Sequence, residues 1–180
     1  EKSDAAPSDL EGSGVTDAET LQLALTAANR LTHELLEGLA AADLRGATTN
    51  AVIAHPLGIL KGVDHLFTGR IERVDVEFIQ KLIASGIVPV IPPLGMDGEG
   101  HSFRLNSDAV ALELAKALGA VKLVFVTTAE GFSIGGAVAR QVAALPDRPT
   151  VSATIGDLPF VADAVVPAAR AMAATGVDIV

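Results

Sequence analysis

The segment from Gly86 to Gly131 constrains the fold more than any other part of this chain. It begins with the apolar run Ile87-Val88-Pro89-Val90-Ile91, which is typical of a strand buried on both faces. A polar cluster, Asn106-Ser107-Asp108, then opens an apolar helix predicted over 107–118, and a second buried strand is predicted over 122–127. A helix that begins beside the end of a buried strand is where α/β proteins usually hold ligands.

The composition of the 180 residues favours helices packed on a parallel sheet. Hydrophobic residues make up 49% of the chain and aromatic residues only 3%, so Ala, Val, Leu and Ile must fill a large core. The net charge of −9 argues against nucleic-acid binding and against anionic membranes.

Several other classes of protein are excluded by what the sequence lacks. There are no cysteines for a disulfide framework or a thiolate metal site, and the four histidines have no paired metal spacing, so no metal is expected. No apolar run approaches the ~18 residues of a membrane span. The first residues are too polar and acidic for a signal peptide, so we expect a cytoplasmic protein.

Capping and turn signals predict the order of the elements. The capping box Thr16-Asp17-Ala18-Glu19 predicts a helix that runs to about Leu36 and stops at Gly38. We expect a polar lead over 1–14 and a single domain over 15–180. The other predicted elements are a strand at 50–54, an exposed hairpin arm at 68–74, a helix over 76–85 capped by Asp75, a turn at 96–100, helices at 137–145 and 160–174, and strands at 150–153 and 177–180.

Several motifs have two interpretations. Asn106-Ser107-Asp108 is either an ordinary helix cap or a phosphate or carboxylate site in which Asp108 orients a cation or a metal-bound phosphate. Gly131-Phe132-Ser133-Ile134-Gly135 matches a hydrolase nucleophile elbow, but no histidine follows His101, so we interpret it as a loop. The glycines of 95–100 indicate a hairpin tip, and His65 is predicted to be a solvent-facing loop histidine.

Together these residues resemble the amino-acid kinase family, in particular the acetylglutamate kinases and the kinase-like domain of N-acetylglutamate synthases. The resemblance rests on Val15-Thr16-Asp17, Gly62-Val63-Asp64, Thr68-Gly69-Arg70 and the stretch 86–131. It implies a three-layer αβα sandwich with a mostly parallel sheet, in which the family's first strand-helix-strand unit is not represented. It also implies a homo-oligomer, since the family forms dimers and hexamers.

The resemblance also implies site residues. Asp108 takes the position of the aspartate that organises the catalytic lysines, and it is the expected catalytic residue. Asn106 and Arg104 take substrate-binding positions. The expected nucleotide-binding residues are Thr127, Thr128 and Gly131.

Both catalytic lysines of the family lack a counterpart, and no lysine occurs after Lys122. Two functions from different classes therefore stay open beside a purely structural α/β domain. One is phosphorylation of N-acetylglutamate by ATP with Mg in arginine biosynthesis. The other is a catalytically silent domain that senses arginine and regulates a fused or partner acetyltransferase domain.

Overall fold

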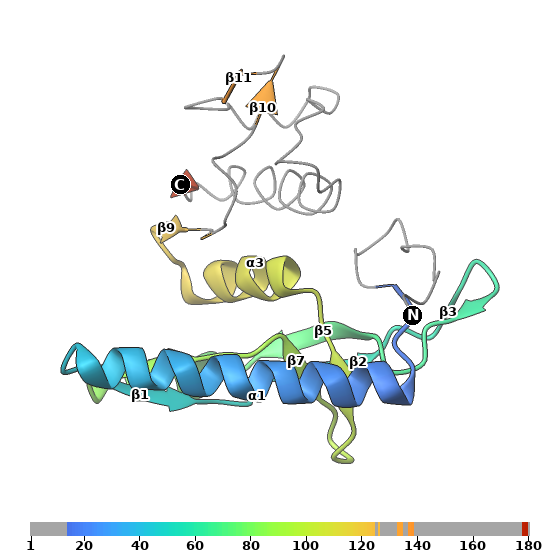
Figure 1. Ribbon diagram of the computed structural model, residues 1–180, viewed down its shortest axis with the longest axis horizontal. Coiled ribbons are helices and arrows are strands. Elements are labelled where there is room, and N and C mark those ends of the chain that lie inside the picture. The colour runs from blue at the N-terminus through green and yellow to red at the C-terminus, as the bar shows by residue number, and fades with distance from the viewer. Residues whose placement is uncertain (1–13, 125, 127–132, 135–136, 139–177, 180) are drawn as a thin grey trace. The chain divides into compact units, whose positions relative to one another are not determined.

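Figure 1 shows the computed structural model, which describes residues 14–124, 126, 133–134, 137–138 and 178–179. The chain divides into two compact units, Glu1–Val110 and Ala111–Val180. The prediction of a polar lead followed by a single domain stays a prediction. Within the described ranges, no helix combines the length and the apolar content that crossing a bilayer requires.

Helix α1 (Ala18–Ala41), the long blue helix of Figure 1, begins one residue later than the capping-box prediction implied. Asp17 is its N-cap, and Oδ1 of Asp17 accepts a hydrogen bond from the amide N of Thr20 at 2.7 Å. This bond satisfies one of the free N–H groups of the first turn. Thr16 is not the cap, because its hydroxyl lies in a buried contact with another segment.

The helix continues through Gly38, where an end was predicted, because its last turns pack on strand β1 (Arg45–Thr48). A side-chain carbon on Gly46 of that strand would lie 2.7 Å from terminal carbons of both Leu36 and Leu39. The bare backbone of Gly46 therefore lets the two leucines approach closely. This packing outweighs the low helix propensity of Gly38.

Replacing Gly38 by alanine is expected to stabilise the protein by about 0.5–1 kcal/mol, because alanine loses less backbone entropy in a helix. No heavy atom lies within 4 Å of the position that the new carbon would take. Thermal unfolding measures the change. Gly119→Ala is the control: space is also open there, but its φ of +60° disfavours any side chain, so the control should be destabilised.

Strand β1 pairs in parallel with β6 (Ile87–Val90), with Arg45 opposite Ile87. Helix α2 (Val76–Ala84) precedes β6 and is capped by Asp75 as predicted: Oδ1 of Asp75 accepts from the amide N of Phe78 at 3.0 Å. The prediction that β6 is buried on both faces is wrong, since Val88 is 37% exposed. Among the described strands, β6 pairs only with β1. The apolar run therefore overstates how deeply β6 is buried.

A four-stranded mixed sheet carries the core of the first unit. Its spatial order is β5 (Gly69–Val74), β2 (Val52–Pro56), β7 (Leu94–Met96) and β8 (Ser102–Arg104). Strand β2 pairs antiparallel with β5 and parallel with β7, and β7 and β8 form the hairpin predicted around 96–100. The predicted arm at 68–74 is therefore an edge strand of this sheet. The buried side chains around it include Val52, Ala54, Phe103 and Leu105.

Helix α3 (Ser107–Leu118) has the bounds predicted for it. The short strands β3 (Ile59–Leu60) and β4 (Val63–Asp64) form an antiparallel hairpin in the first unit. In the second unit, β9 (Lys122–Leu123) pairs in parallel with β12 (Asp178–Ile179), which lies within the predicted last strand.

Strands β10 (Ser133–Ile134) and β11 (Ala137–Val138) pair antiparallel, so the helix predicted from residue 137 does not begin there. The strand predicted at 150–153 and the helix predicted at 160–174 lie outside the described residues.

Candidate functional site

Three segments of the first unit meet through backbone pairing, and we call them the junction: residues 14–16, 65–68 and 104–108. The amide N of Phe67 donates to the carbonyl O of Thr16 at 2.9 Å, and the amide N of Arg104 donates to the carbonyl O of Phe67 at 2.9 Å. Parallel bridges join Thr16 to Leu66 and Thr68 to Arg104. The motif pieces that are far apart in the sequence are therefore neighbours.

The third segment leads directly into α3, and Asn106 caps this helix. Oδ1 of Asn106 accepts hydrogen bonds from the amide N of Asp108 at 2.9 Å and from that of Ala109 at 3.0 Å. The cap interpretation of the polar cluster is therefore confirmed. The role of Asn106 and of the half-buried Arg104 in substrate binding stays a prediction.

Asp108 lies half-buried in the first turn of α3. Burial raises the pKa of its carboxyl above the ordinary value of 3.8. The helix N-terminus favours a negative charge at this place, but among the described residues no ion pair reaches Asp108. A carboxylate whose pKa is raised by the loss of hydration is typical of a functional site. The catalytic role of Asp108 stays a prediction.

The Asp108→Asn variant is expected to be more stable than the wild type at neutral pH. A raised pKa means that the folded state binds the proton more tightly, so the ionised form lowers stability above the folded-state pKa. The difference should shrink as the pH falls through the folded-state pKa toward 3.8. Thermal unfolding across this range measures it.

Asp17→Asn is the matched control with the opposite sign. The backbone hydrogen bond from Thr20 lowers the pKa of the Asp17 carboxyl, so its charge adds stability above 3.8 and this contribution is lost as the pH falls. A wild type more stable than Asp108→Asn at neutral pH would contradict the account of Asp108.

Sequence reasoning missed the buried polar core of the junction. Thr16 and Thr68 have no exposed surface, and their Oγ1 atoms are 2.8 Å apart. His65 is only 3% exposed, so the prediction of a solvent-facing histidine is wrong. Its Nδ1 lies 3.3 Å from the carbonyl O of Gly14, because the first segment of the junction packs over it. Both threonines lie in the family-like motifs, but neither carries a local signal of burial.

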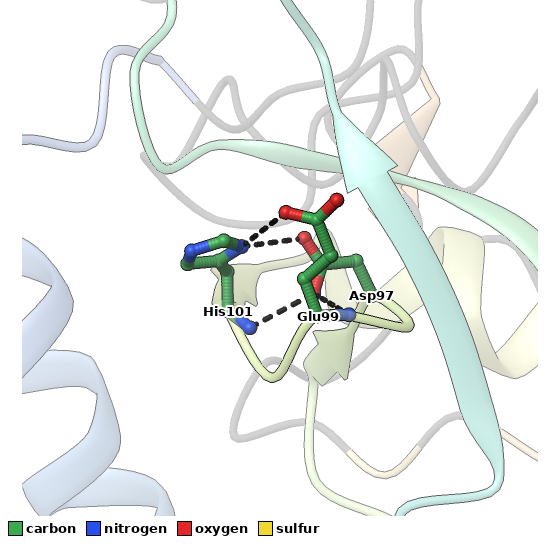
Figure 2. A network of polar contacts seen from close by, with 3 residues as sticks. All are labelled: Asp97, Glu99 and His101. Carbon is green, nitrogen blue, oxygen red and sulfur yellow. Dashed lines mark hydrogen bonds and ion pairs between the residues drawn. The ribbon is translucent and has the colours of Figure 1, made fainter.

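A second polar cluster lies at the tip of the β7–β8 hairpin, where Figure 2 shows Asp97, Glu99 and His101. Oδ1 of Asp97 accepts from the amide N of Glu99 at 2.9 Å and from that of His101 at 2.8 Å, and Oδ2 lies 2.8 Å from Nδ1 of His101. The three side chains place their ligand-type atoms within 4.8 Å of one another. Since Asp97 bonds the turn's own amides, the closing of the hairpin explains the cluster.

Charge in this cluster is coupled. The hydrogen bond that His101 makes to the Asp97 carboxylate raises the pKa of His101, and the charges of Asp97 and, to a smaller extent, Glu99 add to this. Burial acts to raise the pKa of Asp97, but the hydrogen bonds from His101 and Glu99 outweigh it and lower that pKa.

In the Asp97→Asn variant, His101 is expected to titrate at lower pH than in the wild type, because it loses its bonded carboxylate. Glu99→Gln is the control and should lower the pKa less, since its carboxylate is 3.9 Å from the ring nitrogen. NMR titration of the histidine ring reports both. Equal shifts in the two variants would contradict this assignment.

The predicted nucleotide-binding residues Thr127, Thr128 and Gly131 lie outside the described residues. The predicted substrate and catalytic positions, Arg104, Asn106 and Asp108, all lie in the third segment of the junction. Arg104 bridges Thr68 of the second segment and also pairs with Leu94 of β7.

Comparison with known proteins identifies the class. The model of the amino acid kinase family matches residues 1–176. The chain belongs to the amino acid kinase family, as the sequence motifs indicated.

Within this class, the chain is similar to amino-acid acetyltransferases. It is 38% identical over 126 residues to that of Escherichia fergusonii and 40% identical over 126 residues to that of Serratia proteamaculans. Each alignment covers 65% of this chain and 28% or 29% of the relative. The chain thus spans less than a third of the length of these relatives.

Solved structures confirm the α/β fold of the family. N-acetylglutamate synthase from Neisseria gonorrhoeae, solved with coenzyme A and N-acetyl-glutamate, gives a TM-score of 0.78 at 24% identity, over 93% of this chain and 39% of that one. The same enzyme solved with coenzyme A and L-arginine gives 0.73 at 23% identity, over 93% and 41%. The protein smu.665 from Streptococcus mutans gives 0.77 at 24% identity, over 97% and 72%.

Proposed function

We propose that this chain is the kinase-like domain of an N-acetylglutamate synthase of arginine biosynthesis and that it binds arginine at the junction. The similarity to amino-acid acetyltransferases over 126 residues carries the first part of the proposal. One synthase of this fold was solved with L-arginine, which supports arginine as the ligand, and the charges of the junction support its place there.

The charges of the junction suit an amino acid with a cationic side chain. Arg104 offers a guanidinium, whose donors match a carboxylate in a bidentate arrangement. Asp108 offers a half-buried carboxylate, and a cationic ligand group beside it would offset the solvation that it has lost. The net charge of −9 also attracts a cationic ligand.

Phosphorylation of N-acetylglutamate by ATP with Mg is the second candidate, and the position of Asp108 at the start of α3 favours it. This candidate lacks the lysine side chains that would stabilise a transferring phosphoryl group. No lysine occurs among residues 123–180, and Asp108 has no ion pair within the described part of the chain. The residues present therefore fit a binding domain better than a phosphoryl-transfer site.

Ligand-induced stabilisation tests the proposal. A ligand that binds only the folded state at 100 times its Kd stabilises it by about 2.7 kcal/mol. Arginine is expected to raise the Tm of the wild type and to do so less in Asp108→Ala, with citrulline, which lacks the cationic side chain, as the control ligand. Stabilisation by ATP with Mg and N-acetylglutamate, with ATP turnover that Asp108→Ala abolishes, would instead establish the kinase.

A further inference from the structure

The buried polar core of the junction is a continuous chain of hydrogen bonds. Oγ1 of Thr68 lies 2.9 Å from the carbonyl O of Gly14 and 2.8 Å from Oγ1 of Thr16. Nδ1 of His65 lies 3.3 Å from the same carbonyl O. Neither threonine has exposed surface, and His65 is 3% exposed, so water contributes little to satisfying these groups.

Elementary hydrogen-bond chemistry fixes the direction of the chain. The Gly14 carbonyl only accepts, and a hydroxyl has a single proton. Thr68 therefore donates to Gly14, and its oxygen accepts the proton of Thr16. The ring of His65 must carry its proton on Nδ1 to contact the same carbonyl favourably. Thr68 is the central member, because it both donates and accepts.

The backbone around Thr68 connects this series of hydrogen bonds to Arg104, the side chain predicted to bind the ligand. The peptide of Phe67, immediately before Thr68, accepts from the amide N of Arg104 and donates to the carbonyl O of Thr16. Thr68 and Arg104 are also bridge partners. The segment 65–68 thus links the backbone of Arg104, which also pairs with Leu94 in the β7–β8 hairpin, to residues 14–16.

The loop that carries Thr68 includes an unfavourable backbone conformation. Leu66 has a φ of 51°, in the left-handed region that residues other than Gly, Asn and Asp seldom adopt. Two hydrogen bonds hold it: Leu66 N to Oδ1 of Asp64 at 3.0 Å, and Thr68 N to the carbonyl O of His65 at 2.9 Å. Residues held in such conformations cluster at functional sites.

We propose that Thr68 is a positioning residue for amino-acid binding: its hydroxyl holds the segment 14–16 against the strand that presents Arg104. The inference rests on the proposed function, since it assigns Thr68 a role in the affinity of that same site. Thr68 contacts no ligand in this account. It acts through the geometry of Arg104 and of the first segment.

The test compares arginine affinity among three variants of the full chain by calorimetry. Thr68→Val keeps the shape and removes the hydroxyl, and should weaken binding about tenfold, which corresponds to the loss of one net hydrogen bond. Thr68→Ser retains the hydroxyl and should bind within about twofold of the wild type. Thr49→Val removes another buried hydroxyl, one that accepts from the amide N of Ala51 outside the junction, and should leave affinity unchanged.

A double-mutant cycle separates positioning from general destabilisation. In an Arg104→Gln background, Thr68→Val should weaken binding by much less than tenfold, because the side chain that Thr68 positions is gone. If Thr68→Val does not fold, Thr16→Val removes the outer hydroxyl of the same chain and carries the same expectation.

The inference is overturned if Thr68→Val binds arginine as the wild type does, or if Thr49→Val weakens binding equally. If the wild type binds arginine and Thr68→Val has the same affinity, the role of Thr68 is rejected and the proposed function is kept. A wild type that binds no arginine rejects both.

Discussion

The Ile79→Ala variant is expected to lose about 2–5 kcal/mol of unfolding free energy, the range for removing a buried aliphatic side chain. Ile79 has no exposed surface and lies in α2, which packs against β6. Deleting its outer carbons leaves a cavity that the surrounding backbone can close only in part. Urea unfolding measures the loss as a lower midpoint at an unchanged slope.

Ile83→Ala is the matched control on the same helix. Ile83 is 52% exposed, so the same chemical change removes little buried surface and should cost much less. Equal losses in the two variants would contradict the account that Ile79, and not Ile83, lies on the buried face of α2.

The Gly95→Ala variant is expected to lose about 1–3 kcal/mol through overpacking of the four-stranded sheet. The added carbon would lie 2.4 Å from Cβ of Ala54 and 3.0 Å from Cδ1 of Leu105. Ala54 has no exposed surface and belongs to the adjacent strand β2, so the backbone of one strand must move. Thermal unfolding reports the loss.

Gly98→Ala is the control for Gly95. It lies in the turn of the same hairpin, where an added carbon meets no heavy atom within 4 Å and where φ is not positive. Its effect should be small. A loss for Gly98→Ala as large as that for Gly95→Ala would contradict the close approach of β2 and β7.

Local signals predicted the elements whose ends are fixed by their own residues. Asp75 caps α2 and Asn106 caps α3, and both helices follow apolar periodicity, so their positions were readable from the sequence. The turn around 96–100 was readable for the same reason, since Asp97 bonds the amides of its own loop.

Tertiary contacts decided what the sequence could not predict. Gly38 lies within α1 because neighbouring leucines pack on β1, and Thr16 is buried because it pairs with a residue 52 positions away. His65 is buried by a segment that precedes α1. Each feature depends on which distant segment lies nearby, and no local pattern encodes that.

In the candidate site, too, the part with a local sequence signal was predicted and the part that depends on distant contacts was not. The start of α3 with Asp108 was predicted from the polar cluster and from the family resemblance. The threonine core of the junction was not, because two isolated threonines carry no signal of burial until their segments are paired.

Calorimetric titration of the wild-type chain with L-arginine tests the central claim most directly. The account predicts saturable heat with one arginine bound per chain, weakened in Asp108→Ala. It also predicts no matching heat for citrulline, which lacks the cationic side chain. Absence of arginine binding, or equal binding of arginine and citrulline, would contradict the claim that the junction is a site for a cationic amino acid.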